Sequence, residues 1–154
     1  MKQRILFDTN IVLDLIQGRP GYEAAAQILQ RQEDGELDIC VSILSMADIA
    51  YVLRKTVAAP LIVPTLKQVS SILTVVPMDD SQLQDAILLE GPDFEDILQL
   101  CCAAANGCSL VLTHNPRDFK ITKGLLASYP FPQVSTPEDF MLFAGSASSF
   151  PASK

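Results

Sequence analysis

The chain has 154 residues, 49% of them hydrophobic and 19% charged, so it can bury the core of one domain and is too short for two ordinary ones. Its formal net charge of -7 excludes a general coat for nucleic acid, because the surface as a whole repels phosphates. It leaves open an enzyme that holds a divalent metal ion. A core of aliphatic residues without Trp is typical of a parallel sheet covered by helices.

The cysteine pattern and the apolar runs indicate the compartment. Four cysteines lack C-x-x-C spacing: Cys40, Cys101, Cys102 and Cys108. We expect reduced, structural thiols rather than a zinc site, because residues 101 and 102 point in different directions on a helix and His114 is the only histidine. Asp8 interrupts the apolar run that a signal peptide needs, and no run approaches the ~18 apolar residues of a membrane span. The sequence therefore predicts a cytoplasmic protein with no membrane segment.

Predicted strands and helices alternate along the chain. Strands are expected at residues 4–7, 37–41, 75–76, 108–112 and 131–134. Helices are expected from the turn at 8–10 to Gly18, at 20–35, 43–55 and 60–73, within 77–89 and 91–107, and after the cap "TPED" at 136–139. The helix over 43–55, which Ser42 caps, is apolar on almost every side and is therefore expected to be buried on two sides.

This alternation predicts an α/β fold with a mostly parallel sheet that helices cover on both faces. No repeat or linker divides the chain, so residues 1–144 are expected to form one domain. The last ten residues, "GSASSFPASK" at 145–154, are predicted to be a disordered tail.

Acidic residues stand near the predicted carboxyl ends of the strands. Asp8 follows the first strand directly, and Asp48 lies one and a half turns into the helix after the second strand. The helix before the fourth strand carries Asp93 and Asp96, and the turn after that strand holds Asp118. Ligands bind beyond the carboxyl ends of the strands in such sheets, so these separated acids could converge on one place.

Helix capping accounts for several of these acids equally well. Asp8 or Asn10 could cap the helix that follows, and "DFED" is a capping-box variant with Asp93 at the cap and Asp96 three residues on. "NPRDF" repeats the pattern from Asn115, and so does "TPED", to which we assign no chemistry. The cap pattern alone is therefore no evidence for a site.

Asp48 is harder to explain structurally. Most other positions of its helix are apolar, so the carboxylate is expected to lie against packed surface, and Asp96 has a similar setting. An unpaired buried carboxylate destabilises a fold unless a charge or a hydrogen bond offsets its burial. An ion pair with Arg54 or Lys55 is the structural alternative for Asp48.

Carboxylates gathered in one pocket raise each other's pKa, and a divalent cation removes that penalty. Oxygen ligands without His or Cys indicate Mg²⁺ or Mn²⁺ rather than Zn²⁺. Two such ions about 4 Å apart can generate a hydroxide nucleophile and stabilise the leaving oxygen in phosphodiester cleavage.

Four blocks of the sequence resemble the PIN domain family. They are "RILFDTNIVLDLI" at 4–16, "VSILSMADIAYVLRK" at 41–55, "DFEDILQLCCAAANGCSLVLTHNPRDF" at 93–119 and "VSTPEDF" at 134–140. The most similar branch includes VapC-type toxins of bacterial toxin–antitoxin pairs. "DTN" alone would be a weak signal, whereas the four blocks in order, covering nearly the whole chain up to Phe140, are a specific one.

The resemblance implies a three-layer α/β/α sandwich with a central, mostly parallel sheet of four to five strands. It also implies a metal-dependent ribonuclease whose acids lie at the carboxyl edge of that sheet. By position, the family acids that hold Mg²⁺ or Mn²⁺ and activate water would be Asp8, Asp48, Asp96 and Asp118. Asp48 stands where many members have Glu, which moves its charge back by one methylene.

Neighbouring positions match accessory residues of the family: Thr9, Asn10, Asp93 and Asn115. Thr9 and Asn10 would orient Asp8 or a metal-bound water, with ordinary turn chemistry as the alternative. His114 stands where the family often has Arg, so one phosphate contact is expected to be weaker. Basic residues near the blocks are candidates for RNA phosphate contacts, with a solvated charged rim as the alternative for each: Arg54, Lys55, Arg117, Lys120 and Lys123.

We therefore predict a PIN-type endoribonuclease that cleaves single-stranded or structured RNA. By resemblance it would be the toxin of a toxin–antitoxin pair, would form a homodimer and would be inhibited by an antitoxin that inserts near the site. One alternative is a PIN-fold binding or regulatory module without nuclease activity. The other is a phosphatase or phosphoacceptor domain, but Asp-nucleophile phosphatases carry a second Asp two residues after the first, where this chain has Asn10.

Overall fold

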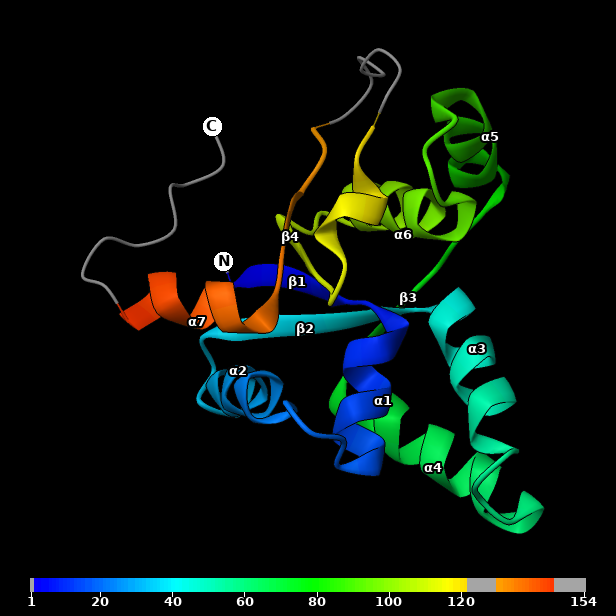
Figure 1. Cartoon of the computed structure of the whole chain (residues 1–154), viewed down its shortest axis with the longest axis vertical. Helices are drawn as coiled ribbons and strands as arrows, with labels where there is room; N and C mark the ends of the chain where they lie inside the picture. Colours follow the sequence, from blue (N-terminus) through cyan, green and yellow to red (C-terminus); the bar gives the residue numbers. More distant parts are fainter. Residues whose placement is uncertain (1, 122–129, 146–154) are drawn as a thin grey trace.

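Five parallel strands form the centre of the computed structural model, which describes residues 2–121 and 130–145 (Figure 1). Their order across the sheet is β3-β2-β1-β4-β5. The strands are β1 (Gln3–Phe7), β2 (Leu37–Ser42), β3 (Thr74–Val76), β4 (Leu110–Leu112) and β5 (Gln133–Ser135). Every neighbouring pair is parallel, so the predicted sheet is confirmed.

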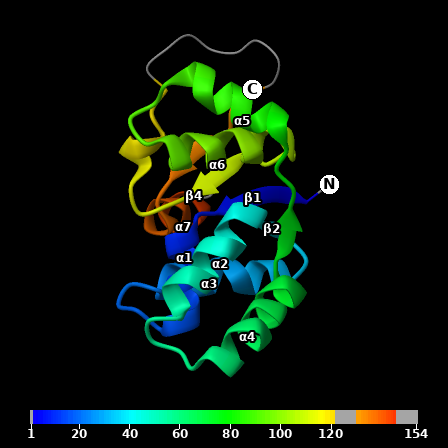
Figure 2. The same ribbon diagram turned by 90° about the vertical axis from the view of Figure 1, so that its right-hand side faces the viewer.

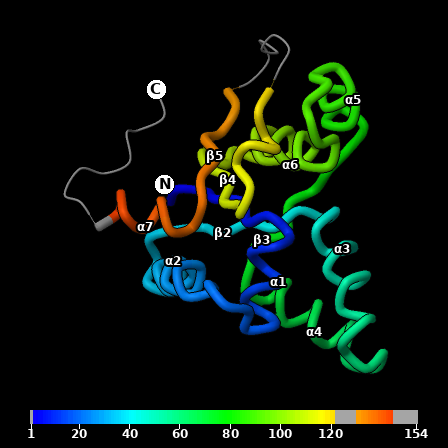
Figure 3. The backbone as a smooth tube through the Cα atoms, in the orientation of Figure 1, coloured from blue at the N-terminus to red at the C-terminus, as the bar shows by residue number. Residues whose placement is uncertain are grey.

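Helices cover both faces of the sheet, which confirms the three layers. One face carries α1 (Thr9–Gln17), α2 (Glu23–Glu33), α3 (Ile43–Leu53), α4 (Ala59–Ile72) and α7 (Pro137–Gly145), and the other carries α5 (Asp80–Leu89) and α6 (Phe94–Ala105). Figure 2 shows α5 and α6 above the sheet and α1 to α4 below it. The path in Figure 3 runs from β3 through α5 and α6 before it returns to β4 and β5.

The alternation of side chains along the strands builds two apolar cores. Ile5 and Phe7 of β1 join the cluster under α1 to α4, whereas Leu6 joins the cluster under α6 with Cys40. The four cysteines are buried, as predicted, and no disulfide joins them. The central strand is thus covered on both sides, which fixes where its carboxyl end lies.

Two predicted helices differ from the structure. α2 begins at Glu23 rather than Pro20, because Gly21 has a φ of 91°, outside the helical region. The expectation that α3 is buried on two sides is wrong, since Ile43 and Tyr51 are 54% and 55% exposed. α3 packs on α1, α4 and β2, and its other face is open. An apolar pattern indicates that burial of that helix surface is favourable. It does not indicate whether the same chain or another one buries it.

Parts of the sequence-based predictions lie outside the described residues: Lys123, and residues 146–154 of the predicted tail. The division into a domain at 1–144 and a tail therefore stays a prediction. Among residues 2–121 and 130–145, no helix is long and apolar enough to cross a membrane.

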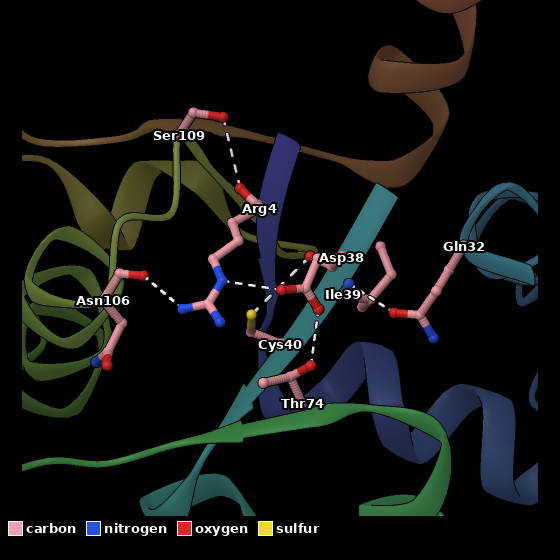
Figure 4. Close-up of polar contacts among 8 residues, drawn as sticks. All are labelled: Arg4, Gln32, Asp38, Ile39, Cys40, Thr74, Asn106 and Ser109. Carbon is pink, nitrogen blue, oxygen red and sulfur yellow. Dashed lines mark hydrogen bonds and ion pairs between the residues drawn. The ribbon is translucent and has the colours of Figure 1, made fainter. Parts of the chain in front are cut away.

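A polar network joins three strands at the amino end of the sheet (Figure 4). Arg4 Nε donates to Asp38 Oδ2 at 2.9 Å, and its Nη1 donates to the carbonyl of Asn106 at 2.8 Å. Thr74 Oγ1 donates to Asp38 Oδ1 at 2.7 Å. The network links β1, β2 and β3 to the end of α6. The charges of Arg4 and Asp38 therefore have a structural role.

Candidate active site

Capped helix starts gather at the carboxyl edge of the sheet. α1 begins directly after Asp8 at the end of β1, and α3 begins after β2, where Ser42 Oγ accepts from the backbone N of Ser45 at 3.0 Å (Figure 1). α6 begins after Asp93, whose Oδ1 accepts from the backbone N of Asp96 at 3.1 Å. Helix N-termini carry partial positive charge, so this edge favours carboxylates.

Asp8 is the most deeply placed acid of the site, with 6% exposure. Its Oδ1 accepts from the backbone N of Thr9 at 2.8 Å, and its Oδ2 accepts from Thr113 Oγ1 at 2.8 Å. Burial raises the pKa of Asp8, while the hydrogen bonds from Thr113 and Thr9 act in the opposite direction. Asp8 is therefore both the N-cap of α1 and a carboxylate held in a fixed orientation.

Asp96 lies near three other acids, Asp8, Asp93 and Asp118, and together the four form the acid cluster. Burial, followed by the charges of Asp8, Asp93 and Asp118, raises the pKa of Asp96 to about 7. These groups come from the end of β1, from the start of α6 and from the 3-10 helix η1 (Pro116–Phe119). Three of the four predicted metal-binding acids, at positions 8, 96 and 118, thus lie within electrostatic reach of one another.

The fourth predicted acid, Asp48, faces a carboxyl group that was not predicted. A hydrogen bond between Asp48 and Glu95, followed by burial and by the charge of Asp48, raises the pKa of Glu95 to about 7. The charges of Asp93 and Asp96 act in the same direction, so this pair borders the acid cluster. Spacing within the sequence does not signal Glu95, because its place beside Asp48 depends on how α6 packs on α3.

The ion pair offered as an alternative for Asp48 is wrong. Across the described residues, the salt bridges do not include Asp48. Arg54 instead places its Cζ 4.1 Å from the ring centre of Tyr51, and Lys55 places its Nζ 5.5 Å from the same ring. Both cations therefore lie at the C-terminal end of α3, beyond the first turns that face the acids.

His114 borders the cluster from the end of β4. Its Nε2 contacts Oδ2 of Asp14, a carboxylate on α1 whose side chain is 8% exposed, and Arg19 Nη1 lies 3.8 Å from Asp14 Oδ1. The charge of His114 lowers the pKa of Asp8. His114 thus lies within electrostatic reach of Asp8, and Asp14 is a buried partner that sequence reasoning passed over inside an apolar run.

The remaining predicted residues lie on the rim. Asn10, Asn115, Arg117 and Lys120 are exposed, the last three in or beside η1 with Asp118. Thr9 is half-buried, and its Oγ1 lies 2.8 Å from Ser45 Oγ. Gln99, which was not predicted, is 1% exposed and donates from Nε2 to Ser45 Oγ at 2.6 Å.

The acids suit a hydrated divalent cation better than a closed metal cage. Within residues 2–121 and 130–145, no three Asp, Glu, His or Cys side chains are grouped tightly enough to enclose an ion. Mg²⁺ usually keeps several waters and binds one or two carboxylates together with substrate phosphates. Burial and the neighbouring negative charges raise the pKa of Asp96, and a bound cation would lower it by offsetting that charge. The donor set therefore fits a divalent cation that prefers oxygen ligands.

Comparison with known proteins agrees with this geometry. The family model of the PIN domain matches residues 4–117. Ribonuclease VapC1 from Aquifex aeolicus (strain VF5) is 26% identical over 119 residues, which cover 73% of this chain and 82% of the relative.

Two solved structures share the fold. DNA-bound VapBC from Salmonella typhimurium aligns with a TM-score of 0.62 at 20% identity, over 89% of this chain and 99% of the other. A toxin–antitoxin complex from Klebsiella pneumoniae gives 0.61 at 22% identity, over 86% and 97% of the two chains. Because the PIN domain match spans more than half of the sequence, including three of the four predicted acids, the chain belongs to the PIN domain family.

Proposed function

We propose that this protein is a metal-dependent endoribonuclease, the toxin of a toxin–antitoxin pair, that hydrolyses RNA phosphodiester bonds. The observation that carries the proposal is the convergence of Asp8, Asp96 and Asp118 at the carboxyl edge of the sheet, where burial, followed by the charges of neighbouring acids, raises the pKa of Asp96 to about 7. Membership of the PIN domain family and similarity to Ribonuclease VapC1 support this reaction class.

The acids have distinct tasks in this proposal. Asp8, Asp96 and Asp118 hold one or two Mg²⁺ or Mn²⁺ ions, which supply Lewis-acid stabilisation and an activated water when bound. Thr113 and the backbone of Thr9 hold the Asp8 carboxylate in one orientation, so its direction is set before substrate arrives. Asp48, with Glu95 beside it, forms the α3 wall of the site and is the further ligand available to a second ion.

Residues around η1 are suited to contact the RNA. Arg117 and Lys120 are exposed beside Asp118, where a phosphate backbone that enters the acid site would pass, and Asn115 lies next to them. Arg54 and Lys55 cover Tyr51 at the other end of α3, so we expect a smaller contribution from them. The local basic rim offsets part of the repulsion that the net charge of -7 imposes on RNA.

A cleavage assay tests the proposal. Purified protein is incubated with labelled RNA, with Mn²⁺, with Mg²⁺ or with chelator, beside Asp8→Asn, Asp96→Asn and the surface control Asp80→Asn. We expect metal-dependent cleavage that is lost in the first two variants and retained in the control. Metal binding without cleavage would favour the regulatory PIN module, and a phosphoryl group trapped on Asp8 would favour the phosphoacceptor.

An antitoxin partner follows from the same proposal, since one of the structures with this fold is a toxin–antitoxin complex. An apolar groove of about 500 Å³ lies between α1, α2 and α4, lined in part by Leu15, Ile16, Leu29 and Val69. It suits an apolar segment of the antitoxin. Leu29→Lys is expected to abolish co-purification with the antitoxin and to leave metal-dependent cleavage unchanged. If Leu29→Lys loses both co-purification and cleavage, the substitution has disrupted folding rather than the antitoxin contact alone.

The open face of α3 supports a homodimer. Ile43 and Tyr51 lie two turns apart on this face, and both are more than half exposed. A second copy of the chain would cover them and remove apolar surface from water. Sedimentation of wild type is expected to show a dimer that Ile43→Asp converts to a monomer, and an unchanged dimer would exclude this face.

A further inference from the structure

Three side chains form a hydrogen-bonded chain beneath the acid cluster. Gln99 on α6 donates from Nε2 to Ser45 Oγ on α3 at 2.6 Å, and Ser45 Oγ lies 2.8 Å from Thr9 Oγ1 at the start of α1. Gln99 and Ser45 are buried, whereas Thr9 is half-buried. The chain therefore leads from the interior to the residue that follows Asp8.

The direction of the hydrogen bonds follows from the donors available. A hydroxyl has one hydrogen, and Ser45 Oγ already receives the N–H of Gln99. Among the described residues, Thr9 Oγ1 is the only acceptor partner of the Ser45 hydroxyl. A buried hydroxyl hydrogen without an acceptor would destabilise the folded protein. Ser45 therefore donates to Thr9, and the hydrogen of Thr9 is left free to donate elsewhere.

Gln99 carries an independent sign of function. Within the described part of the chain, its Oε1 is buried without a hydrogen-bond partner. A Met or Leu would fill similar space without that orphaned oxygen, so packing alone does not explain an amide here. The amide supplies an N–H, which an apolar side chain lacks, and this N–H sets the direction of the hydrogen bonds from Gln99 through Ser45 to Thr9.

In addition to the exposed residues around η1, a hydroxyl next to Asp8 would give bound RNA a hydrogen-bond donor that the acids themselves do not supply. Ionised carboxylates of Asp8, Asp96 and Asp118 only accept hydrogen bonds, and so do the phosphate oxygens of RNA. We propose that Gln99 is a positioning residue that acts through Ser45, so that the hydroxyl of Thr9 donates its hydrogen bond to a phosphate oxygen of bound RNA. This inference rests on the nuclease function proposed above. The bond strengthens as charge develops on that oxygen during cleavage.

The sharpest test reverses the direction of the hydrogen bonds among Gln99, Ser45 and Thr9 while keeping side chains of similar shape. In Gln99→Glu the carboxylate accepts from Ser45, so Ser45 accepts from Thr9 and the Thr9 hydrogen turns inward. We expect Gln99→Glu and Thr9→Val each to lower kcat by about 10- to 100-fold, with KM changed by no more than about 3-fold, because a donor used in the transition state is lost. Gln99→Met removes the N–H without adding charge and is expected to give a smaller loss of kcat.

The double variant and the conservative variant separate positioning from packing. Thr9→Val with Gln99→Glu is expected to be no slower than the worse single variant, and Thr9→Ser is expected to keep kcat near wild type, because both effects converge on one hydroxyl. Losses of kcat that multiply in the double variant, or wild-type kcat in Gln99→Glu, would overturn the inference.

Thermal unfolding without RNA or metal tests the chain separately from nuclease activity. Side chains 9 and 99 both contact Ser45, so their substitutions are expected to lower Tm by less together than the sum of the two single losses. Additive Tm losses would contradict a connected chain even if the protein cleaves RNA. If the variants show non-additive Tm losses but the wild-type protein does not cleave RNA, the nuclease function and the RNA contact of Thr9 are refuted. The hydrogen bonds that join Thr9, Ser45 and Gln99 would still stand.

Discussion

Replacing Asp96 with Asn is expected to stabilise the metal-free protein at pH 8. A carboxylate in the first turn of a helix usually stabilises it, because it faces the positive end of the helix dipole. Asp96 stands in the first turn of α6, yet burial and the charges of Asp8, Asp93 and Asp118 raise its pKa to about 7. Burial and repulsion together therefore exceed the favourable dipole contribution at this position, and an uncharged side chain of the same shape avoids the cost of placing a charge there.

The sign and the size follow from linkage. The folded protein holds the Asp96 proton more tightly than the unfolded chain, in which the carboxyl has its ordinary pKa of 3.8. Stability is therefore highest below pH 3.8 with respect to this group, falls as pH rises towards 7 and is constant above it. Unscreened, such a displacement corresponds to about 4 kcal/mol. Because the side chain of Asp96 is only partly buried, solvent screening reduces this, and we expect about 1–2 kcal/mol at pH 8.

Urea unfolding of wild type and Asp96→Asn between pH 4 and pH 8, with chelator present, measures this difference. The matched control is Asp80→Asn, which changes a carboxylate in the first turn of α5, away from the acid cluster. We expect the control to be destabilised slightly at neutral pH, opposite in sign to the Asp96 variant. A destabilised Asp96→Asn at pH 8, or a gain that does not grow with pH, would refute the proposed repulsion.

Three further outcomes are expected. Mn²⁺ should raise the Tm of wild type and not of Asp8→Asn in differential scanning fluorimetry, because binding only to the folded state stabilises it. Asp38→Asn should lower the urea-derived stability by about 1 kcal/mol, because Arg4 loses its carboxylate partner; unchanged stability would mean that water replaces the contact. Gly91→Ala should cost about 1–3 kcal/mol and reduce cleavage, since its Cβ would lie 2.2 Å from Ile97 Cγ1 at the start of α6; calorimetry beside a cleavage assay checks both.

The fold was predictable because strand and helix patterns alternate without interruption. β1 and β2 are short apolar runs, with a capping residue directly after β1 and at the last position of β2, so the positions of Asp8 and Ser42 follow from sequence. The start of α2 was not, because Gly21 adopts a left-handed conformation that composition alone does not reveal. Nor was the open face of α3 predictable, since an apolar helix surface has the same pattern whether this chain or a partner covers it.

The acids near the ends of strands were predictable for a topological reason. Parallel strands place their carboxyl ends at one edge, so Asp8 and Asp118, which follow β1 and β4, are brought near each other by the sheet itself. Asp48 and Asp96 lie on helices, and their direction depends on how α3 and α6 pack. That packing pairs Asp48 with Glu95 and Ser45 with Gln99, contacts that a linear spacing within either helix does not contain.

Capping and metal chemistry, which the sequence presents as alternatives, use the same carboxylate in this fold. Asp8 Oδ1 caps α1 through the N–H of Thr9, while Oδ2 accepts from Thr113, and each carboxylate oxygen retains a further lone pair. Asp93 likewise caps α6 while its charge acts on Asp96. The helix starts that satisfy these caps also supply partial positive charge, which lets the fold hold several acids close together before any cation binds. The cap sequences therefore accompany the site because helix N-termini make such a cluster tolerable.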